Sequence, residues 1–270
     1  MPSSGRHTVS NRPQQDQIIW KAGSPPQLEL GEAVLFYPGV GSDWKPPVKL
    51  FGPWVDTFVL VDRDRRGLFD SLSHSVLPFN FVANEPQSLD RLKDAVVKAV
   101  LESGRSVSIK WICGDGLEAI AELDDRIGVF FYRGDSSEGS DLWWLFHTEQ
   151  EMESDADGWE QEDEEDEDFG ETLGLHGLFH EVLNRLADGA LLVTDGSKGD
   201  GDGTISPADP NSYSQISAFR GRRDIIPADA MNQAESFRGP LGHTFECVGC
   251  INQMRRYDKG PVLIWQVGSP

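Results

Sequence analysis

The chain has 270 residues, 38% of them hydrophobic, and this ordinary globular composition excludes a wholly disordered or a fibrous protein. Its formal net charge of −21 disfavours nucleic acid as a partner, because a phosphate backbone requires neutralising cations. The longest apolar runs hold about six residues, whereas a membrane-spanning helix requires roughly twenty.

The N-terminal residues and the cysteines indicate the compartment. The N-terminus lacks the apolar stretch of a secretory signal. The chain has three cysteines, Cys113, Cys247 and Cys250, and an odd number with the first far from the other two is not a disulfide framework. We therefore expect a soluble cytoplasmic protein with no membrane partner.

The N-terminal part of the chain changes character near residue 28. Residues 1–27 are polar and rich in Ser, Pro and Gln, which predicts a flexible tail with at most a short helix near Ile18. Residues 28–270 are predicted to form one domain. Within it, the apolar run at 33–37 predicts a buried strand that ends in a glycine-rich turn.

Alternating apolar runs and amphipathic segments continue along the chain. A helix is predicted over 88–103, where six apolar residues share one face, and a second helix over 174–186. Further strands are predicted at 57–61, 107–113, 127–132, 190–194, 243–248 and 261–267, with a Gly/Asp-rich loop at 195–241.

The predicted order of elements indicates the fold class. Continuous apolar strands separated by helices are typical of a parallel sheet with both faces covered. We therefore predict an α/β fold, a doubly wound, mostly parallel Rossmann-like sheet with a C-terminal antiparallel strand pair.

Acidic residues follow four of the predicted strands. In open parallel sheets, ligands bind beyond the carboxyl ends of the strands. Together with the glycine turn, these carboxylates would create a negative field suited to a cation, hydroxyls or a metal. The four are Asp62, Asp115, Asp135 and Asp195.

This layout resembles the class I S-adenosylmethionine-dependent methyltransferases over about residues 30–267. The resemblance lies in the loop Tyr-Pro-Gly-Val-Gly-Ser-Asp at 37–43, in Asp62 at the end of the second strand, and in the helix-then-strand segment at 183–195. It departs at Asp43, where a third glycine is usual. The acid that often opens the first motif is absent, and so is an Asn-Pro-Pro-Tyr-type motif.

The resemblance implies S-adenosylmethionine as the cofactor and a small molecule or a protein as the methyl acceptor. It places Gly39 and Gly41 near the methionyl part of the cofactor and Asp62 on the ribose hydroxyls, and it counts Asp43 among the cofactor-binding residues. It also places Asp115 near the adenine and makes Asp135 the catalytic residue, facing the methyl group. The alternative is a purely structural role, in which the glycines make a tight turn and the aspartates are helix N-caps.

Another enzyme class shares part of this pattern. Asp62-Arg63-Asp64 is similar to the nucleophile motif of the haloacid dehalogenase superfamily, which transfers phosphoryl groups with magnesium. Lys198, Asp200 and Asp202 would complete that site. However, Arg66 replaces the small residue that is usual at its position.

Two possible metal sites are weaker. Residues 198–209 resemble part of an EF-hand calcium loop, but Pro207 blocks the exiting helix, so a glycine-rich loop is favoured. Cys247 and Cys250 form a CxxC that would bind zinc with His176 and His180. Two ordinary buried thiols are favoured; we assign no metal-binding residue, and whether the protein binds a metal stays open.

The strongest compositional feature is an acidic segment from Glu149 to Glu171. It holds fourteen acidic and no basic residues, which favours a solvated, disordered insertion. Its functional interpretation is a decoy for basic proteins, since closely spaced carboxylates imitate a phosphate backbone, with Trp159 and Phe169 as anchors. A non-catalytic binding protein that engages basic partners is therefore the alternative to the methyltransferase.

Overall fold

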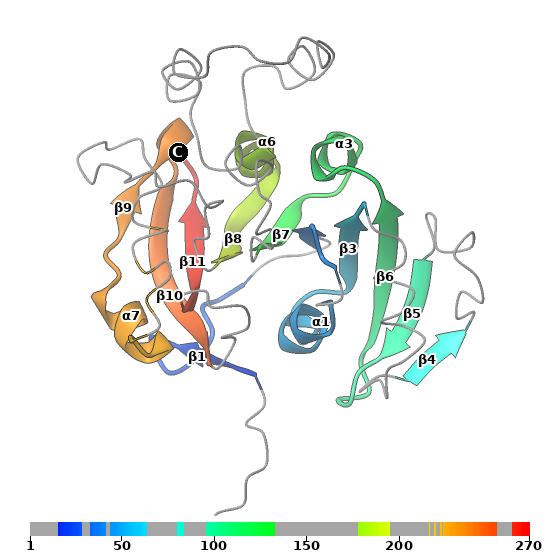
Figure 1. The fold of residues 1–270 in the computed structure, drawn as a ribbon, viewed down its shortest axis with the longest axis horizontal. Coiled ribbons are helices and arrows are strands. Elements are labelled where there is room, and N and C mark those ends of the chain that lie inside the picture. The colour runs from blue at the N-terminus through cyan, green and yellow to red at the C-terminus, as the bar shows by residue number, and fades with distance from the viewer. Residues whose placement is uncertain are drawn as a thin grey trace, which may run out of the picture.

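The computed structural model describes residues 16–28, 33–41, 44–63, 80–83, 96–132, 178–194, 224–252 and 261–270, together with residues 216, 219 and 222. The described residues form one mixed sheet that runs across the molecule (Figure 1). Among them, no helix has both the length and the apolar character that crossing a membrane requires.

The sheet contains strands from almost the whole length of the chain. Its order is β1-β10-β11-β8-β7-β2-β3-β6-β5-β4, and β9 pairs with β10 beside this path. The strands are β1 Gln17–Trp20, β2 Val34–Pro38, β3 Thr57–Asp62, β4 Asn80–Ala83, β5 Val96–Val100, β6 Ser106–Cys113, β7 Ile127–Tyr132, β8 Leu186–Thr194, β9 Phe237–Arg238, β10 Thr244–Asn252 and β11 Val262–Gly268. The helices are α1 Lys45–Phe51, α3 Gly116–Ala121, α6 Leu178–Arg185 and α7 Pro227–Gln233, with the 3-10 turn η3 Pro240–Gly242.

The five central strands are parallel, and the chain builds them outward from β2. From β2 it proceeds to β3 and β6 on one side, and then to β7 and β8 on the other. Every residue of β2 is buried, as expected for a strand with both faces covered. The strands that follow β2 in the chain are therefore added first on its β3 side and then on its β7 side, so the strand order reverses between β2 and β7.

The prediction of a doubly wound, mostly parallel Rossmann-like sheet is wrong. Of the ten strand pairings in the described part of the chain, six are antiparallel and four are parallel. The described residues include four α-helices, fewer than such a fold requires. Antiparallel strands flank the parallel centre on both sides, because β4 and β5 extend one edge and β11, β10 and β1 extend the other.

Two apolar clusters cover the two faces of the sheet. Val48 and Phe51 of α1 pack in one cluster with Leu35 of β2. The other cluster joins β2 to α3, α6 and α7, and includes Ile120 and Val182. The alternation of side chains along β2 directs neighbouring residues to opposite clusters, and so fixes its register.

Two predictions fail where a segment is a strand paired at an edge of the sheet. Val96–Val100 is a strand antiparallel to β6, although 88–103 was expected to be helical; residues 88–95 lie outside the described residues. Its β-branched valines favour a strand once β6 offers an unpaired edge. Likewise Gln17–Trp20, expected in the tail, is a strand paired with β10.

Two other predicted strands match the structure to within one residue at their ends, whereas the predicted loop contains regular elements. The strand predicted over 127–132 is β7, and the one predicted over 107–113 begins one residue earlier, as β6. The described part of the predicted loop at 195–241 contains α7 and β9. The predicted acidic insertion lies outside the described residues.

Candidate functional site

The turn after β2 bends sharply over the end of β3. Gly39 and Gly41 have φ values of +64° and +50°, in the left-handed region that side chains with a Cβ rarely adopt. Between them, Val40 is buried, and its amide donates to the carbonyl of Val61 at 3.1 Å. The glycines therefore let the chain leave β2 and fold back onto its parallel neighbour.

Asp62 holds this turn. As the last residue of β3, it accepts a hydrogen bond on Oδ2 from the amide of Gly41 at 2.5 Å. Pro38, the last residue of β2, pairs with Val61 of β3, so the glycine turn begins beside the end of β3, where Asp62 lies. The structure thus brings together three of the residues that the sequence singled out.

The end of β6 is joined to the same place by three contacts. The guanidinium of Arg63 forms an ion pair with the carboxylate of Asp115. The amide of Gly114 donates to the Asp62 carbonyl at 3.1 Å, and the Cys113 thiol lies 3.8 Å from the Arg63 carbonyl. Asp115 therefore lies at the end of β3 beside Arg63, and β3 separates it from β2 and the glycine turn.

Arg63 is the residue that the sequence reasoning missed as a site residue. It was considered only as the middle of Asp62-Arg63-Asp64. Its position directly after a strand-ending aspartate was the available signal, but its partner is 52 residues further along the chain. Only the pairing of β3 with β6 shows that partner.

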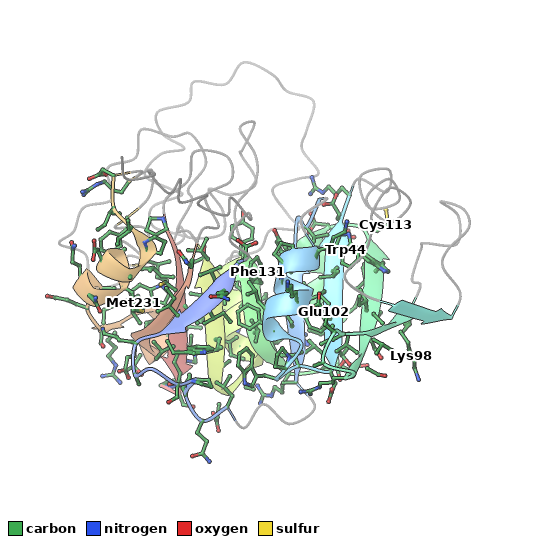
Figure 2. All side chains as sticks on the ribbon, turned by 90° about the horizontal axis from the view of Figure 1, so that it is seen from below. Trp44, Lys98, Glu102, Cys113, Phe131 and Met231 are labelled. Atoms are coloured by element: carbon green, nitrogen blue, oxygen red, sulfur yellow. The ribbon has the colours of Figure 1, made fainter. Side chains whose placement is uncertain are left out.

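An aromatic layer supports the turn. Trp44 follows the turn and is fully buried, with its ring 5.2 Å from that of Trp111 in an edge-on contact. The Lys45 ammonium lies 5.6 Å from the Trp44 ring, and burial lowers the pKa of Lys45. Trp44 and Phe131 both pack in the core beside α1 (Figure 2). This rigid packing fixes the start of α1, and with it the glycine turn.

The side chains at this edge determine which ligand groups fit. An ionised carboxylate only accepts hydrogen bonds, so Asp62 and Asp115 would meet hydroxyl or amino groups of a ligand. A phosphate placed directly on either one would be repelled. The arrangement therefore suits a ligand with hydrogen-bond donors and positive charge.

Cys247 and Cys250, the two thiols of the zinc alternative, are buried in the core. Burial raises the pKa of Cys247 to about 11 and that of Cys250 to about 12, so both are neutral thiols at physiological pH. Both lie in the apolar cluster of α3, α6 and α7. The described residues include no group of three or more His, Cys, Asp or Glu side chains arranged to hold a metal ion.

Several predicted site residues lie outside the described residues. These are the cofactor-binding candidate Asp43, the catalytic candidate Asp135, the strand-end Asp195, and Asp64, Lys198, Asp200 and Asp202 of the phosphohydrolase alternative. His176 and the side chain of His180 lie outside as well. Their roles stay predictions.

Comparisons with known proteins identify no family. No family model matches the chain, and no curated protein matches it. A solved structure described as a conserved hypothetical protein of Streptococcus pyogenes is similar at 9% sequence identity, with a TM-score of 0.36. The match covers 87% of this chain and 85% of that one. A similarity this low identifies neither a fold nor a function.

Proposed function

We propose that the edge formed by Gly39, Gly41, Asp62 and Asp115 binds S-adenosylmethionine, and that the protein transfers its methyl group to a small molecule or a protein. The observation that carries the proposal is the hydrogen bond from the Gly41 amide to Asp62. It joins a glycine turn to a strand-ending carboxylate on adjacent parallel strands.

The location of these residues supports the proposal. Ligands of sheets with parallel strands bind beyond the carboxyl ends, where the strand order reverses. Here that reversal falls between β2 and β7, and the glycine turn leaves the carboxyl end of β2. Asp62 is next to it, at the carboxyl end of β3.

The chemistry of the donors and acceptors favours this cofactor over a phosphorylated one. The ribose of S-adenosylmethionine offers two hydroxyl donors to Asp62, and its adenine offers an amino group to Asp115. The cofactor has no phosphate, and its sulfonium is cationic, which suits a chain with a net charge of −21. A dinucleotide would instead bring phosphates to an edge lined with carboxylates.

The role of the protein in the reaction would be to position the reactants and exclude water. When bound, the cofactor would supply an activated methyl group. The acceptor would form a bond to the methyl carbon as the bond from that carbon to sulfur breaks, and S-adenosylhomocysteine would be the leaving group. Asp135 is proposed to face the acceptor. The charge of the chain disfavours a nucleic acid as that acceptor.

Titration calorimetry with S-adenosylmethionine tests the proposal. We expect the wild type to bind, and Asp62→Ala to bind about tenfold more weakly or worse, because a charged hydrogen-bond partner is lost. Asp56→Ala is the matched control, since Asp56 directly precedes the same strand at its opposite end. No heat of binding with the folded wild type, or equal losses in the two variants, would refute the proposal.

The two alternatives make different predictions. A magnesium-dependent phosphohydrolase would release phosphate from p-nitrophenyl phosphate, and Asp62→Asn would abolish this activity. A binding protein that acts through the acidic segment would lose its capture of a basic protein such as histone when residues 149–171 are deleted. Neither alternative depends on S-adenosylmethionine.

A further inference from the structure

The two buried cysteines of β10 lie on the same face of the sheet. In a regular strand, residues three positions apart point to opposite faces, because side chains alternate. Here the pairing of β10 with β11 shifts register between Cys247 and Gly249, so β10 contains a bulge between the two cysteines. Cys247 pairs with Trp265, and Cys250 pairs with Leu263. Because these partners are two positions apart on β11, the bulge makes the two cysteines neighbours on one face.

The apolar clusters agree with this placement. Cys247 and Cys250 both belong to the cluster that contains Phe245, whereas Val248 and Ile251 pack in the cluster on the opposite face. Burial raises the pKa of Cys250 most, and the charge of Cys247 raises it further, which requires the two thiols to be close to each other. Both cysteines are free. The strand β10 therefore presents two neighbouring thiols to the interior.

The surroundings of the two thiols favour one kind of metal ion. The described part of the chain brings no third His, Cys, Asp or Glu side chain into a group with them. Structural zinc takes four ligands, so two thiols would leave it half coordinated, whereas copper(I) prefers soft sulfur donors and is stable with two of them. Met231 of α7, the helix that packs against β10, adds a soft thioether to the same cluster (Figure 2).

We propose that Cys247 and Cys250 form a two-thiolate site for copper(I). On binding, each thiol releases its proton to water and forms one bond from sulfur to copper. The oxidation state of the metal and of both sulfur atoms stays the same, so the step needs no oxidant or reductant. Coordination deprotonates a thiol even where burial favours its neutral form.

A positive side chain acts on the proposed site. Two thiolates with one copper(I) ion carry a net charge of −1, which is costly in an apolar cluster. Burial raises the pKa of Cys247, and the positive charge of Lys21 acts against this rise. The Lys21 amide donates to the carbonyl of Val248 at 2.8 Å, which holds its backbone beside the bulge. Lys21 would therefore offset part of the charge of the loaded site.

Competition with bathocuproine disulfonate, a chromophoric copper(I) chelator, tests the proposal under reducing and oxygen-free conditions. Because both thiols are buried, the ion is offered to the native protein and also during refolding from denaturant. The wild type is compared with Cys247→Ala, Cys250→Ala and the double variant. Cys113→Ala is the matched control, since Cys113 is a free cysteine on a different strand, β6. Circular dichroism checks that each variant is folded.

We expect the folded wild type to withhold one equivalent of copper(I) from the chelator. Each single variant should lose more affinity than the roughly 10- to 100-fold that removal of an outer-shell partner costs, because a direct ligand is lost. Cys113→Ala should bind like the wild type, and zinc offered alone should not be retained. X-ray absorption of the loaded wild type should show sulfur ligands, and this measurement requires no variant to fold.

Four results would overturn the proposal. The wild type could retain no copper(I) under either condition, or the double variant could retain as much as the wild type. Cys113→Ala could lose retention, which would place the ion elsewhere. Nitrogen or oxygen ligands in the absorption spectrum would also exclude a two-thiolate site. None of these results depends on whether the protein binds S-adenosylmethionine.

Discussion

Arg126 and Arg185 cap each other's helices. Arg185, the last residue of α6, donates to the carbonyls of Ala121 and Leu123 at the end of α3. Arg126, shortly after α3, donates to the carbonyls of Asn184 and Leu186 at the end of α6, at 3.2 and 3.4 Å. Carbonyls at and just beyond the end of each helix, which the helix leaves unpaired, thus accept hydrogen bonds from an arginine near the end of the other helix.

We expect Arg185→Ala to lower the free energy of unfolding by about 1 kcal/mol, since it removes charged hydrogen bonds from partly exposed carbonyls. Chemical denaturation measures the loss. Arg238→Ala is the control, because its bond to the Gly242 carbonyl spans four residues of one hairpin. If both variants lose the same free energy of unfolding, the arginine contacts between α3 and α6 contribute no stability beyond that of a local hydrogen bond.

The left-handed turn can be tested separately from steric crowding. Gly39 has a φ of +64°, and a Cβ added there meets no atom within 4 Å. Gly39→Ala should therefore cost about 1–2 kcal/mol from backbone conformation alone. Gly114→Ala, also in open space but without a positive φ, should cost much less, and a denaturation midpoint equal to that of Gly39→Ala would contradict this account.

Close backbone approach holds β1 on the sheet. A Cβ added at Gly249 of β10 would lie 2.9 Å from the carbonyl oxygen of Ile19 and 3.0 Å from the Trp20 ring. We expect Gly249→Ala to displace β1 and to accelerate proteolytic removal of the N-terminal strand. The Gly114→Ala variant should be cleaved at the wild-type rate, and an unchanged rate for Gly249→Ala would show that β1 tolerates the shift.

The buried thiols predict a particular dependence of stability on pH. Their pKa values are raised from 9.0 to about 11 for Cys247 and about 12 for Cys250, mainly by burial. The neutral thiol is therefore favoured in the folded protein, and this stabilisation is complete below pH 9. It is lost as the pH rises through 11 and 12, because the unfolded chain ionises first.

Denaturation between pH 8 and 11 measures this slope, and the double variant Cys247→Ala/Cys250→Ala should lose part of it. At neutral pH, a thiol reagent should modify the half-buried Cys113 in the native protein, and the other two cysteines only after unfolding. Rapid native modification of all three would show that the core opens readily.

Local sequence signals identified the strands of the sheet centre and the C-terminal strands β10 and β11, but not β1 and β5. The apolar runs at 127–132 and 107–113 were sufficient to predict β7 and β6, because burial on both faces leaves a continuous apolar pattern. The valines of 96–100 fit a helix face as well as a strand, and only the edge of β6 decides between them. For the same reason, β1 was hidden in a polar stretch.

The candidate site divides in the same way. The sequence by itself determined the glycine turn and the aspartate that ends the second strand, because positive φ values and strand ends leave signals within a few residues. The tertiary structure alone decided that the Gly41 amide meets Asp62, that Arg63 meets Asp115, and that six of the ten described pairings are antiparallel. The two side-chain contacts join residues 21 and 52 positions apart. They depend on which strands pair, and no local pattern encodes that.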